Sequence, residues 1–394
     1  MMTSQLPIFE GDFFADEVIA NPLPVYREMR DLGPIVWMPK HDIWAAVHYA
    51  PVLEILRRPK LFISGRGLSL NDDVNRILIG SSLNSDGDRH RRQRSITAPA
   101  IMPDQLTDIA PMIDRAADSL ADALAREGRF DAVADFARIL PLSIVVELVG
   151  LPDHAKGKML EWADATFNLF EGSNERSRAS FPRLEELRDF LQEYGNPDAL
   201  QNGGLARRIF EIAPTKGIPL EEAAQMMRDY IAPSLDTTIS VAGYLAWHFA
   251  ESPDQWQLVR KNDDLVENAV EETVRLTTPI RAFTRYVAAD VEMHGVKMKE
   301  GQRVMVVYAS ANRDEAVFPD PDKFDVTRKT HRHVGFGQGP HMCMGMHLAR
   351  LELASLVRSM ARRVESWHLD GTPEVAMNNT IRAFASLPMR VKTC

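Results

Sequence analysis

Cysteine is scarce in this chain of 394 residues, which has only Cys343 and Cys394. Two cysteines are too few for a disulfide framework, and they fit a reducing compartment. No stretch reaches the roughly 18 uncharged apolar residues that a membrane-spanning helix needs. The first residues carry acids and prolines in place of a basic start and an apolar run, which excludes a secretory signal. We therefore expect a cytoplasmic protein without a membrane anchor.

Positively charged residues are fewer than negatively charged ones. The chain has 46 lysines and arginines against 55 aspartates and glutamates, which gives a net charge of -9. Nucleic-acid binding rests on a basic surface, so a nucleic acid is not the expected partner. Hydrophobic residues make up 45% of the chain and charged residues 26%, as in a globular protein with a sizeable core. Nothing in the composition marks a second core, and we expect residues 1–394 to form a single domain.

Helical periodicity dominates the middle of the chain. From residue 102 to residue 276, apolar side chains recur three and four positions apart with few turn clusters. Two other regions predict strands: residues 43–47, and residues 291–293 together with 303–307, which look like a hairpin. Residues 314–339 lack periodicity, and a long irregular segment in a compact domain is usually functional. The pattern predicts a mainly α protein with small β-sheets.

The sharpest feature of the sequence surrounds the internal cysteine. Residues 336–345 read Phe-Gly-Gln-Gly-Pro-His-Met-Cys-Met-Gly and precede a helical pattern. Glycines let the backbone approach a large flat group, and the start of a helix favours the thiolate form of cysteine, which binds metals. A lone cysteine is, without context, more often a small buried apolar residue. A zinc site of His331, His333, His341 and Cys343 is a third interpretation, although zinc sites usually show paired ligands at short spacing.

This segment matches Phe-Gly-x-Gly-x-(Arg or His)-x-Cys-x-Gly at every fixed position, and so it resembles the cysteine loop of the cytochromes P450. The resemblance implies the P450 fold, a triangular helical domain with a small β region. It implies that Cys343, in the loop that ends at Gly345, is the axial ligand to the iron of haem b (iron protoporphyrin IX). It also implies that Phe336 packs near the sulfur and that His341 reaches a haem propionate. A thiolate ligand favours cleavage of the O–O bond.

A pair of opposite charges fits the same resemblance. Glu272 and Arg275 lie three residues apart on a predicted helix, where such pairs are usually solvated. In the P450 family this Glu-x-x-Arg pair is buried and ties its helix to the irregular segment ahead of the cysteine. The third partner in this chain would be Lys323 or Arg328.

Cationic side chains for the haem propionates are present as well. His90 and Arg94, four residues apart, share one face of a predicted helix and match the family's His-x-x-x-Arg. In most proteins such a stretch is a solvated basic helix. Arg285 matches a propionate-binding arginine of the family. With His341, these residues supply the several donors that two propionates need.

The oxygen side of the haem is predicted from residues 231–238, which read Ile-Ala-Pro-Ser-Leu-Asp-Thr-Thr within a helical pattern from 221 to 251. P450s usually show Ala-Gly-x-(Asp or Glu)-Thr here, so Asp236 and Thr237 are kept while Pro233 and Ser234 depart from the pattern. We expect Thr237 to hydrogen-bond the bound oxygen and Asp236 to relay protons from solvent. A proline inside a helix predicts a kink or groove, and Ser234 either bonds back along the helix or points into the substrate pocket.

The substrate class is suggested by local resemblance to bacterial P450s that O-demethylate methoxylated aromatic compounds, including para-methoxybenzoic acids. The segments that carry this resemblance are residues 62–69, 310–314, 327–330, 333–336 and 378–382. Arg66 could hold a substrate carboxylate, or it could belong to the haem site or to the fold of the loop. Whether the substrate ring carries a carboxylate or a phenol stays open. The candidate substrate contacts are Arg66, Leu68, Phe167, Phe170, Ser234, Leu235, Ile280, Phe283 and Ile381. Taken singly, each apolar one is more often a core residue.

The resemblance also implies partners, with O2 as a co-substrate. Electrons would come from NAD(P)H through a ferredoxin reductase and an acidic iron–sulfur ferredoxin. The arginines expected near the docking face for the ferredoxin are Arg91, Arg92, Arg350, Arg358 and Arg362, each of which is about as often an ordinary surface arginine.

Two other functions stay open. One is a peroxide-driven haem enzyme, which needs no ferredoxin. The other is a non-catalytic haem-thiolate sensor, in which Asp236 and Thr237 would have no task.

Overall fold

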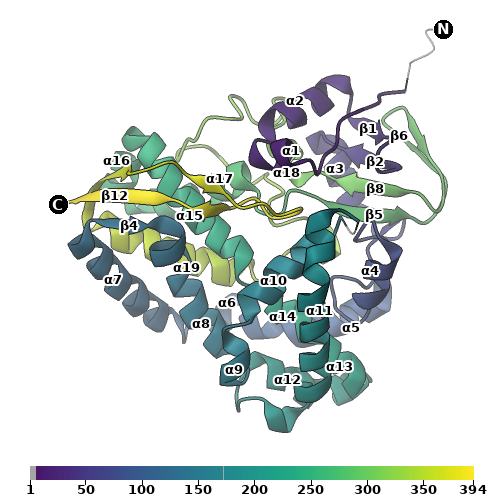
Figure 1. Cartoon of the computed structure of the whole chain (residues 1–394), viewed down its shortest axis with the longest axis horizontal. Coiled ribbons are helices and arrows are strands. Elements are labelled where there is room, and N and C mark those ends of the chain that lie inside the picture. Colours follow the sequence, from purple (N-terminus) through teal and green to yellow (C-terminus); the bar gives the residue numbers. More distant parts are fainter. Residues whose placement is uncertain (1–5, 172) are drawn as a thin grey trace.

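The computed structural model describes residues 6–171 and 173–394 and is mainly helical, as the periodicity predicts (Figure 1). The longer helices are α2 (Leu23–Leu32), α3 (Tyr49–Arg57), α5 (Gly87–Thr97), α7 (Ala110–Glu127), α8 (Ile139–Val149), α10 (Met159–Asn168), α11 (Glu175–Tyr194), α12 (Leu205–Ile212), α15 (Asp236–Glu251), α16 (Pro253–Lys261), α17 (Val266–Thr277) and α19 (Met346–Ala361). The shorter ones are α1 (Asp16–Ala20), α4 (Asp72–Ile77), α6 (Pro103–Leu106), α9 (Asp153–Lys156), α13 (Leu220–Met226), α14 (Arg228–Ile231) and α18 (Tyr308–Ala311).

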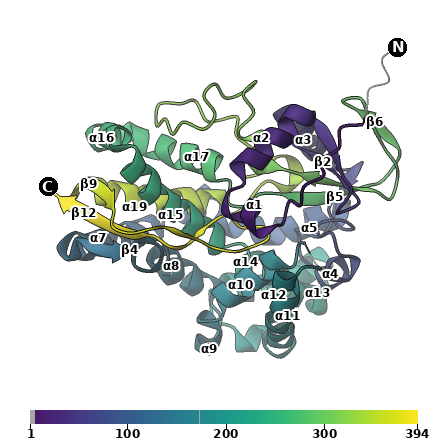
Figure 2. The same ribbon diagram turned by 45° about the horizontal axis from the view of Figure 1, so that its top comes forward.

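The strands form small sheets, also as predicted. They are β1 (Ile35–Met38), β2 (Ile43–Ala46), β3 (Phe62–Ile63), β4 (Arg129–Asp131), β5 (Phe283–Val287), β6 (Val291–Met293), β7 (Val296–Met298), β8 (Arg303–Val306), β9 (Val364–Leu369), β10 (Glu374–Val375), β11 (Phe384–Ser386) and β12 (Pro388–Thr393). The largest sheet has the order β1-β2-β8-β5-β3. It lies beside α1, α2 and α3 on one side of the molecule, whereas α7, α15 and α19 lie on the other (Figures 1 and 2).

The predicted pairing of residues 291–293 with 303–307 is wrong. β6 pairs with β7, and the turn between them is made by His294 and Gly295, both with positive φ. Two such residues close a tight hairpin, so β6 turns back at once and does not reach β8. β8 instead pairs antiparallel with β5 and parallel with β2, with Trp44 opposite Val304.

α15 is the central helix. Its buried residues lie on nearly every side, which is typical of a helix enclosed by other elements. α17, α19 and β9 pack against it, and α7 covers the other side of α19. This arrangement places the beginning of α15 and the beginning of α19, which follows the cysteine loop, within one core.

The helical pattern predicted from 221 to 251 is interrupted. α14 ends at Ile231 and α15 begins at Asp236, with Pro233 between them. Proline lacks the N–H that would donate to the carbonyl of Asp229, and its ring would clash with that carbonyl in a regular helix. The hydroxyl of Ser234 donates to the carbonyl of Tyr230, so the predicted backbone bond of Ser234 is present. The predicted kink is a full break, and it opens the helix beside the cavity described below.

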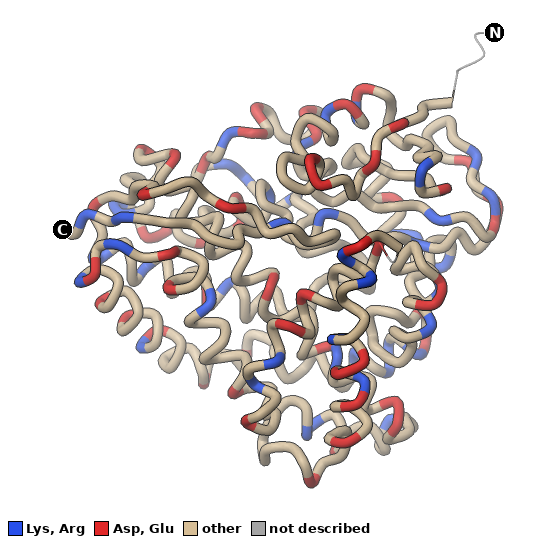
Figure 3. The backbone as a smooth tube through the Cα atoms, in the orientation of Figure 1, with Lys and Arg blue, Asp and Glu red and all other residues tan. Residues whose placement is uncertain are grey.

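Along the residues that the structure describes, charges of both signs are interspersed (Figure 3). Within residues 6–171 and 173–394, no helix is both long enough and apolar enough to cross a membrane.

Candidate active site

A large cavity lies between the cysteine loop and the break before α15. It holds about 1970 Å³ of space free of protein atoms, counting its open mouth. Its walls come from the segment after β3, from α5, α8, α10, α14, α15 and β5, and from the cysteine loop and α19. The residues predicted for the site that line this cavity are Leu68, His90, Arg94, Phe167, Phe170, Ser234, Thr237, Ile280, Phe283, Arg285, Phe336, His341, Cys343 and Gly345.

Four residues predicted for the site do not line the cavity. The guanidinium carbon of Arg66 lies 4.3 Å from the ring centre of Tyr286, where it makes a cation–π contact. Leu235 is fully buried in the core, and Ile381 forms a bridge with Ile280, which does line the cavity. Asp236 is the first residue of α15 and stands next to Thr237.

The cysteine loop is held open by its glycines. Gly337 and Gly339 both have a φ of 71°, and a Cβ at Gly339 would collide with the carbonyl oxygen of Leu56. The backbone N–H of Cys343 donates to the carbonyl oxygen of Phe336 at 2.8 Å, which closes the loop. Cys343 therefore reaches the cavity from a backbone that only glycine allows.

The ionisation of the Cys343 thiol is set by opposing effects. Burial raises the pKa of Cys343, while the backbone N–H groups of Gly345 and Met346 and the guanidinium groups of Arg94 and Arg350 lower it. A metal cation bound to the sulfur would add the charge that keeps it deprotonated.

Four nitrogen-bearing side chains beside Cys343 face the cavity with few acids to match them. The rings of His90 and His341 lie 4.2 Å apart, and Nε2 of His90 is buried without a hydrogen-bond partner. Arg94 Nη2 and Arg285 Nη1 donate only to the carbonyls of Met342 and Thr284, at 2.7 and 2.8 Å. In the part of the chain that the structure describes, neither arginine has a carboxylate within ion-pair distance.

The electrostatics of these donors fit a ligand that carries carboxylates. Burial, and then the neighbouring imidazole of His341, lowers the pKa of His90 to about 4. Burial also lowers the pKa of His341, although the carboxylate of Asp86, 3.8 Å away, raises it. A ligand with two carboxylates would supply the missing negative charge, and a sulfur facing the same space would supply an iron ligand. Among known cofactors, haem has this combination of groups.

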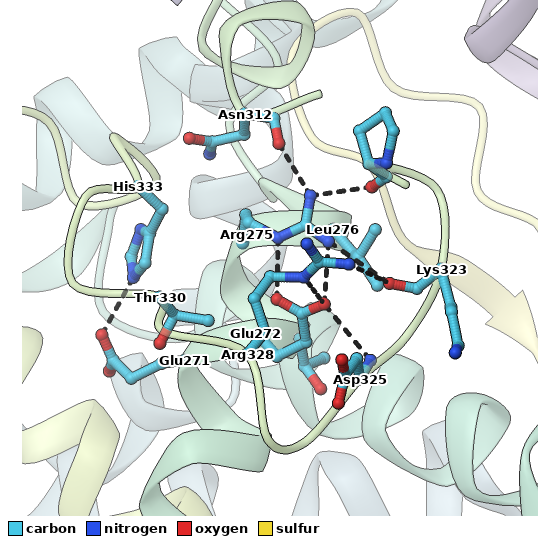
Figure 4. A network of polar contacts seen from close by, with 12 residues as sticks. Glu271, Glu272, Arg275, Leu276, Asn312, Lys323, Asp325, Arg328, Thr330 and His333 are labelled. Carbon is cyan, nitrogen blue, oxygen red and sulfur yellow. Dashed lines mark hydrogen bonds and ion pairs between the residues drawn. The ribbon is translucent and has the colours of Figure 1, made fainter. Parts of the chain in front are cut away.

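A buried network fixes the irregular segment ahead of the cysteine (Figure 4). Glu272 and Arg275 are fully buried, with Oε2 and Nε 2.7 Å apart. Nε of Arg328 lies 2.9 Å from Oε1 of Glu272, so Arg328 is the third partner, whereas Lys323 contributes only its backbone carbonyl. Arg275 also donates to the carbonyls of Asn312 and Pro321, both at 2.8 Å. The network thus holds the first half of the segment, up to Arg328, against α17.

The neighbouring residue Glu271 makes a second connection. Nε2 of His333 lies 2.9 Å from Glu271, and Nε of Arg350, on α19, lies 2.7 Å from it. Burial raises the pKa of Glu271, but the hydrogen bonds from His333 and Arg350 outweigh burial and lower it to about 2. Glu271 therefore joins α17, the irregular segment and α19 around the cysteine loop.

Of the two residues predicted on the oxygen side of the haem, Thr237 lines the cavity and Asp236 does not. Thr237 lines the cavity, and its Oγ1 donates to the carbonyl of Pro233 at 3.1 Å. Burial raises the pKa of Asp236 to about 8, a shift to which Asp164 adds and which Arg138 opposes. At neutral pH Asp236 therefore holds a proton one residue behind Thr237.

Three charged side chains that the sequence analysis did not single out also line the cavity: Arg228, Asp229 and Glu352. Arg228 is 5% exposed and donates to the carbonyl of Ile77 at 2.7 Å, while its Nε has no hydrogen-bond partner. Asp229 is 7% exposed and accepts from the backbone N–H of Ser82 at 3.0 Å. For Arg228 and Asp229 the sequence signal was two charges inside an otherwise uncharged stretch from residue 223 to 235.

Other metal sites are not supported. Within the described residues, no group of three or more His, Cys, Asp or Glu side chains could hold a metal ion, so the zinc interpretation is wrong. His333 is engaged with Glu271 and does not face Cys343 as a co-ligand. The sulfur of Cys343 is left as the candidate metal ligand.

The arginines expected near a docking face are mostly paired with acids. Arg91 pairs with Asp88, Arg350 with Glu271, Arg358 with Asp263 and Glu267, and Arg362 with Asp118. Arg92 is exposed and has no ion pair among the described residues.

Comparisons with known proteins agree with this site. Residues 250–394 match the family model described as "Cytochrome P450". The chain is 34% identical over 387 residues to "Cytochrome p450 CYP199A2" of Rhodopseudomonas palustris, covering 96% of this chain and 93% of that protein. It is 28% identical to "Linalool 8-monooxygenase" of Pseudomonas putida, covering 91% and 92%. Among solved structures, "Cytochrome P450-153 from Novosphingobium aromaticivorans" has a TM-score of 0.84 at 27% identity, covering 97% and 99%.

Fold and site together define an oxidoreductase that incorporates oxygen. The chain belongs to the cytochrome P450 family. Membership of that family implies haem and electrons derived from NAD(P)H through redox partners.

Proposed function

We propose that this chain is a haem-thiolate monooxygenase that O-demethylates or hydroxylates a small methoxylated aromatic substrate. In this proposal residues 1–394 act as one domain, haem b is bound through Cys343, and electrons reach it from NAD(P)H through a ferredoxin reductase and an iron–sulfur ferredoxin. One observation carries the proposal: a cysteine in a glycine-rich loop faces a mostly apolar cavity together with four nitrogen-bearing side chains, of which only His341 has a carboxylate within ion-pair distance among the described residues.

Each residue of this set has a task in holding the haem. Cys343 would supply the sulfur ligand to the iron, and Phe336 and Gly345 border it in the loop. His90, Arg94, Arg285 and His341 supply donors for the two propionates, which would satisfy the unpartnered Nε2 of His90. When bound, the haem supplies the iron that activates O2, and its thiolate ligand favours O–O cleavage.

Protons would be supplied from the start of α15. Asp236, whose pKa burial raises to about 8, carries a proton at neutral pH that it can release towards Thr237. The hydroxyl of Thr237, which now donates to the carbonyl of Pro233, can rotate to donate into the cavity. This acid–alcohol pair supports reductive use of O2 over a peroxide-driven reaction, because peroxide already carries the electrons and protons.

An aromatic acid is the substrate class that the cavity supports best. Phe167, Phe170 and Phe283 form a connected aromatic wall, with Phe170 and Phe283 ring centres 5.0 Å apart and edge to face. Arg228 is a buried cation at the cavity without an acidic ion-pair partner among the described residues, so a carboxylate on the ring would neutralise it. Hydroxylation of a methoxyl carbon would give a hemiacetal that collapses to a phenol and formaldehyde.

The first experiment is the absorption spectrum of the reduced protein with carbon monoxide. We expect a strongly red-shifted Soret band for the wild type and its loss in Cys343→Ala, because only a thiolate ligand gives this band. Cys394→Ala, the other cysteine, should keep the band. A band that survives Cys343→Ala, or a protein that takes up no haem, contradicts the proposal.

The substrate is tested by titration of the haem-loaded protein with para-methoxybenzoic acid and with para-methoxyphenol, followed by the shift to high-spin iron. We expect the acid to bind more tightly than the phenol. Arg228→Met should weaken binding of the acid by about tenfold to a hundredfold, because a charge-assisted hydrogen bond contributes about 1.5–3 kcal/mol. The same substitution should have little effect on binding of the phenol. Arg66→Met, which removes the cation outside the cavity, is the control. Equal losses for acid and phenol would contradict carboxylate recognition at Arg228.

The electron source is tested by turnover. We expect product with NADH, ferredoxin reductase and ferredoxin, and little with peroxide in their place. Efficient turnover with peroxide alone would favour the peroxide-driven alternative.

A further inference from the structure

A second carboxyl group lies between Asp236 and solvent. Asp164 is on α10, a helix that packs against both α14 and α15. The side chain of Asp164 is exposed, Asp236 at the start of α15 is half-buried, and Thr237 lines the cavity. The three residues therefore form a series that leads from the surface of the protein to the cavity.

One short segment of the chain holds Asp164 beside the first turns of α15. The side-chain amide of Asn378 donates to Oδ1 of Asp164 at 2.8 Å and to its backbone carbonyl at 3.3 Å. Four residues further on, the carbonyl of Arg382 accepts from the hydroxyl of Ser240. Ser240 lies about one turn after Asp236 on α15. The segment from 378 to 382 thus contacts both helices close to the two carboxyl groups.

The two carboxyl groups lack a cation that would neutralise them. Among the described residues, neither Asp164 nor Asp236 has a Lys, Arg or His within ion-pair distance, and the hydrogen bonds to the carboxylate of Asp164 come from the amides of Asn378 and Asn168. Partial burial raises the pKa of Asp164, which these amides lower. Two acids close together without a cation hold one proton more readily than none.

The proton of this pair rests on Asp236. Burial raises the pKa of Asp236 to about 8, the charge of Asp164 raises it further, and the exposed guanidinium of Arg138, which precedes α8, opposes both. Asp164 acts from α10 and Arg138 from the other side of the start of α15. The ionised form of Asp164 therefore helps to keep Asp236 protonated at neutral pH.

Anchoring of Asn378 does not account for an aspartate at position 164. The amide of Asn378 needs an acceptor, and the carbonyl oxygen of an asparagine would serve as well. An asparagine would also place no negative charge beside a half-buried acid. The charge and the proton of Asp164 are thus the properties that need another explanation.

The position of these residues is compatible with a bound haem. The cysteine loop lies across the cavity from the start of α15, whereas Asp164, Asp236 and Thr237 all belong to α10 and α15. A haem held by Cys343 would not lie between them. The series of residues is therefore the same with and without the haem.

We propose that Asp164 is the solvent-side proton relay of this site, which takes protons from solvent and passes them to Asp236. This inference rests on the proposed monooxygenase function. Incorporation of one oxygen atom of O2 consumes two electrons, which the redox partners supply, and two protons, and it releases the other oxygen atom as water.

Each proton moves along the series in the same way. The O–H bond of Asp236 breaks, its proton passes to the hydroxyl oxygen of Thr237, and Thr237 passes its own proton into the cavity. Two neighbouring carboxylates are then both ionised, which favours uptake of a proton from solvent by Asp164. Asp164 passes that proton to Asp236, directly or through a water, and returns to its ionised form. No residue of the series exchanges electrons.

The coupling of the two acids is tested without turnover. Infrared difference spectra of the haem-loaded protein, with and without carbon monoxide, should contain the carbonyl stretch of protonated Asp236, identified by its loss in Asp236→Asn. We expect Asp164→Asn to move the pH midpoint of this band down by about one pH unit, because a negative charge is removed. Arg138→Gln should move the midpoint up. Glu161→Gln, which changes an exposed acid on α10 that pairs with Arg183, should leave it in place.

The use of Asp164 as a relay is tested in turnover with NADH and ferredoxin at pH 7. We expect Asp164→Asn to slow product formation by about tenfold and to increase the solvent isotope effect, while Asp164→Glu and Glu161→Gln stay close to wild type. Residues in series are not additive, so Asp164→Asn should have little further effect in the Asp236→Asn background. Haem content, read from the reduced carbon monoxide spectrum, verifies the fold of each variant.

Three results would overturn the relay. One is a wild type without a carbonyl band that depends on Asp236, another is a midpoint that Asp164→Asn leaves unchanged, and the third is equal slowing by Asp164→Asn in the wild-type and Asp236→Asn backgrounds. Failure of the proposed function is seen separately, because a wild type that binds haem but forms no product from any methoxylated aromatic compound still allows the infrared titration.

Discussion

At the scale of single residues, Gly339 shows how closely the cysteine loop is specified. Gly339 has a φ of 71°, and a Cβ there would collide with the carbonyl oxygen of Leu56. Gly217 has nearly the same φ, 66°, but has open space around it. We therefore expect Gly217→Ala to cost only the strain of the left-handed backbone, about 1 kcal/mol, and to keep full haem content.

Gly339→Ala should cost more and should also lower haem content, because the loop must shift and carry Cys343 with it. Chemical denaturation and the reduced carbon monoxide spectrum measure the two effects. Equal stability and equal haem content in the two variants would show that the close approach to Leu56 is unimportant.

Individual residues also mark the limit of what the sequence predicted. The motif residues His90, Arg94, Thr237, His341 and Cys343 all line the cavity, because their spacing is tied to a helix or to a short loop, whereas Asp236 does not line it. The choice between Lys323 and Arg328 needed the structure, since both lie in the irregular segment, where spacing does not fix direction. Arg66 was predicted near the site, yet the ring of Tyr286 attracts its guanidinium elsewhere. Arg228 and Glu352 were missed because a charge in an apolar helical stretch carries no motif.

At the scale of elements, Glu271 connects α17, the irregular segment and α19. Its pKa is lowered from 4.5 to about 2 in the folded protein. A carboxylate with a lowered folded pKa stabilises the fold above its unfolded pKa, and that stabilisation is lost as the pH falls from about 4.5 through about 2. We expect Glu271→Gln to lower the free energy of unfolding by about 2 kcal/mol at pH 7, and the difference from wild type to shrink below pH 4.5.

The control for this prediction is Glu267→Gln. Glu267 lies on the same helix and pairs with Arg358, but its side chain is 59% exposed, so the pair should contribute at most about 1 kcal/mol at any pH. Denaturant unfolding at a series of pH values measures both variants. A difference between wild type and Glu271→Gln that stays constant from pH 7 to pH 3 would contradict the assigned role.

Elements also show why periodicity predicted the helices better than their ends. The helical pattern from 221 to 251 is real on both sides of Pro233, but the backbone between α14 and α15 is set by the missing N–H and by side-chain bonds to carbonyls. The strands β2, β6 and β8 were predicted from composition, whereas their pairing was not, because β8 pairs with β5 and with β2, which lies far away in the chain. Long-range pairing leaves no local mark in the sequence.

At the scale of the whole molecule, the cavity gathers residues from Leu68 to Leu353, so a ligand in it touches most of the chain. A ligand that binds only the folded state stabilises it by about 2.7 kcal/mol at a hundred times its dissociation constant. We expect removal of haem to lower the melting temperature and to speed amide hydrogen exchange in α5 and the cysteine loop, while α7 and α16, which supply no residue to the wall, stay protected. Calorimetry and hydrogen exchange on haem-loaded and haem-free protein measure this. A uniform loss of protection would mean that the haem holds the whole fold and not the cavity walls.

The parallel pairing of β2 with β8 has a consequence for synthesis on the ribosome. The segment that contains β1 and β2 leaves the ribosome early, but its neighbour in the sheet, Arg303–Val306, is made only after about two thirds of the chain has followed. At about 5–20 residues per second, the exposed edge of β2 must wait for more than ten seconds before it is covered. During that interval the nascent chain carries an open strand edge, which makes it a target for chaperones and for pairing with other chains. The order in which the chain is made, and not the stability of the finished protein, would then limit the yield of this enzyme in a foreign host.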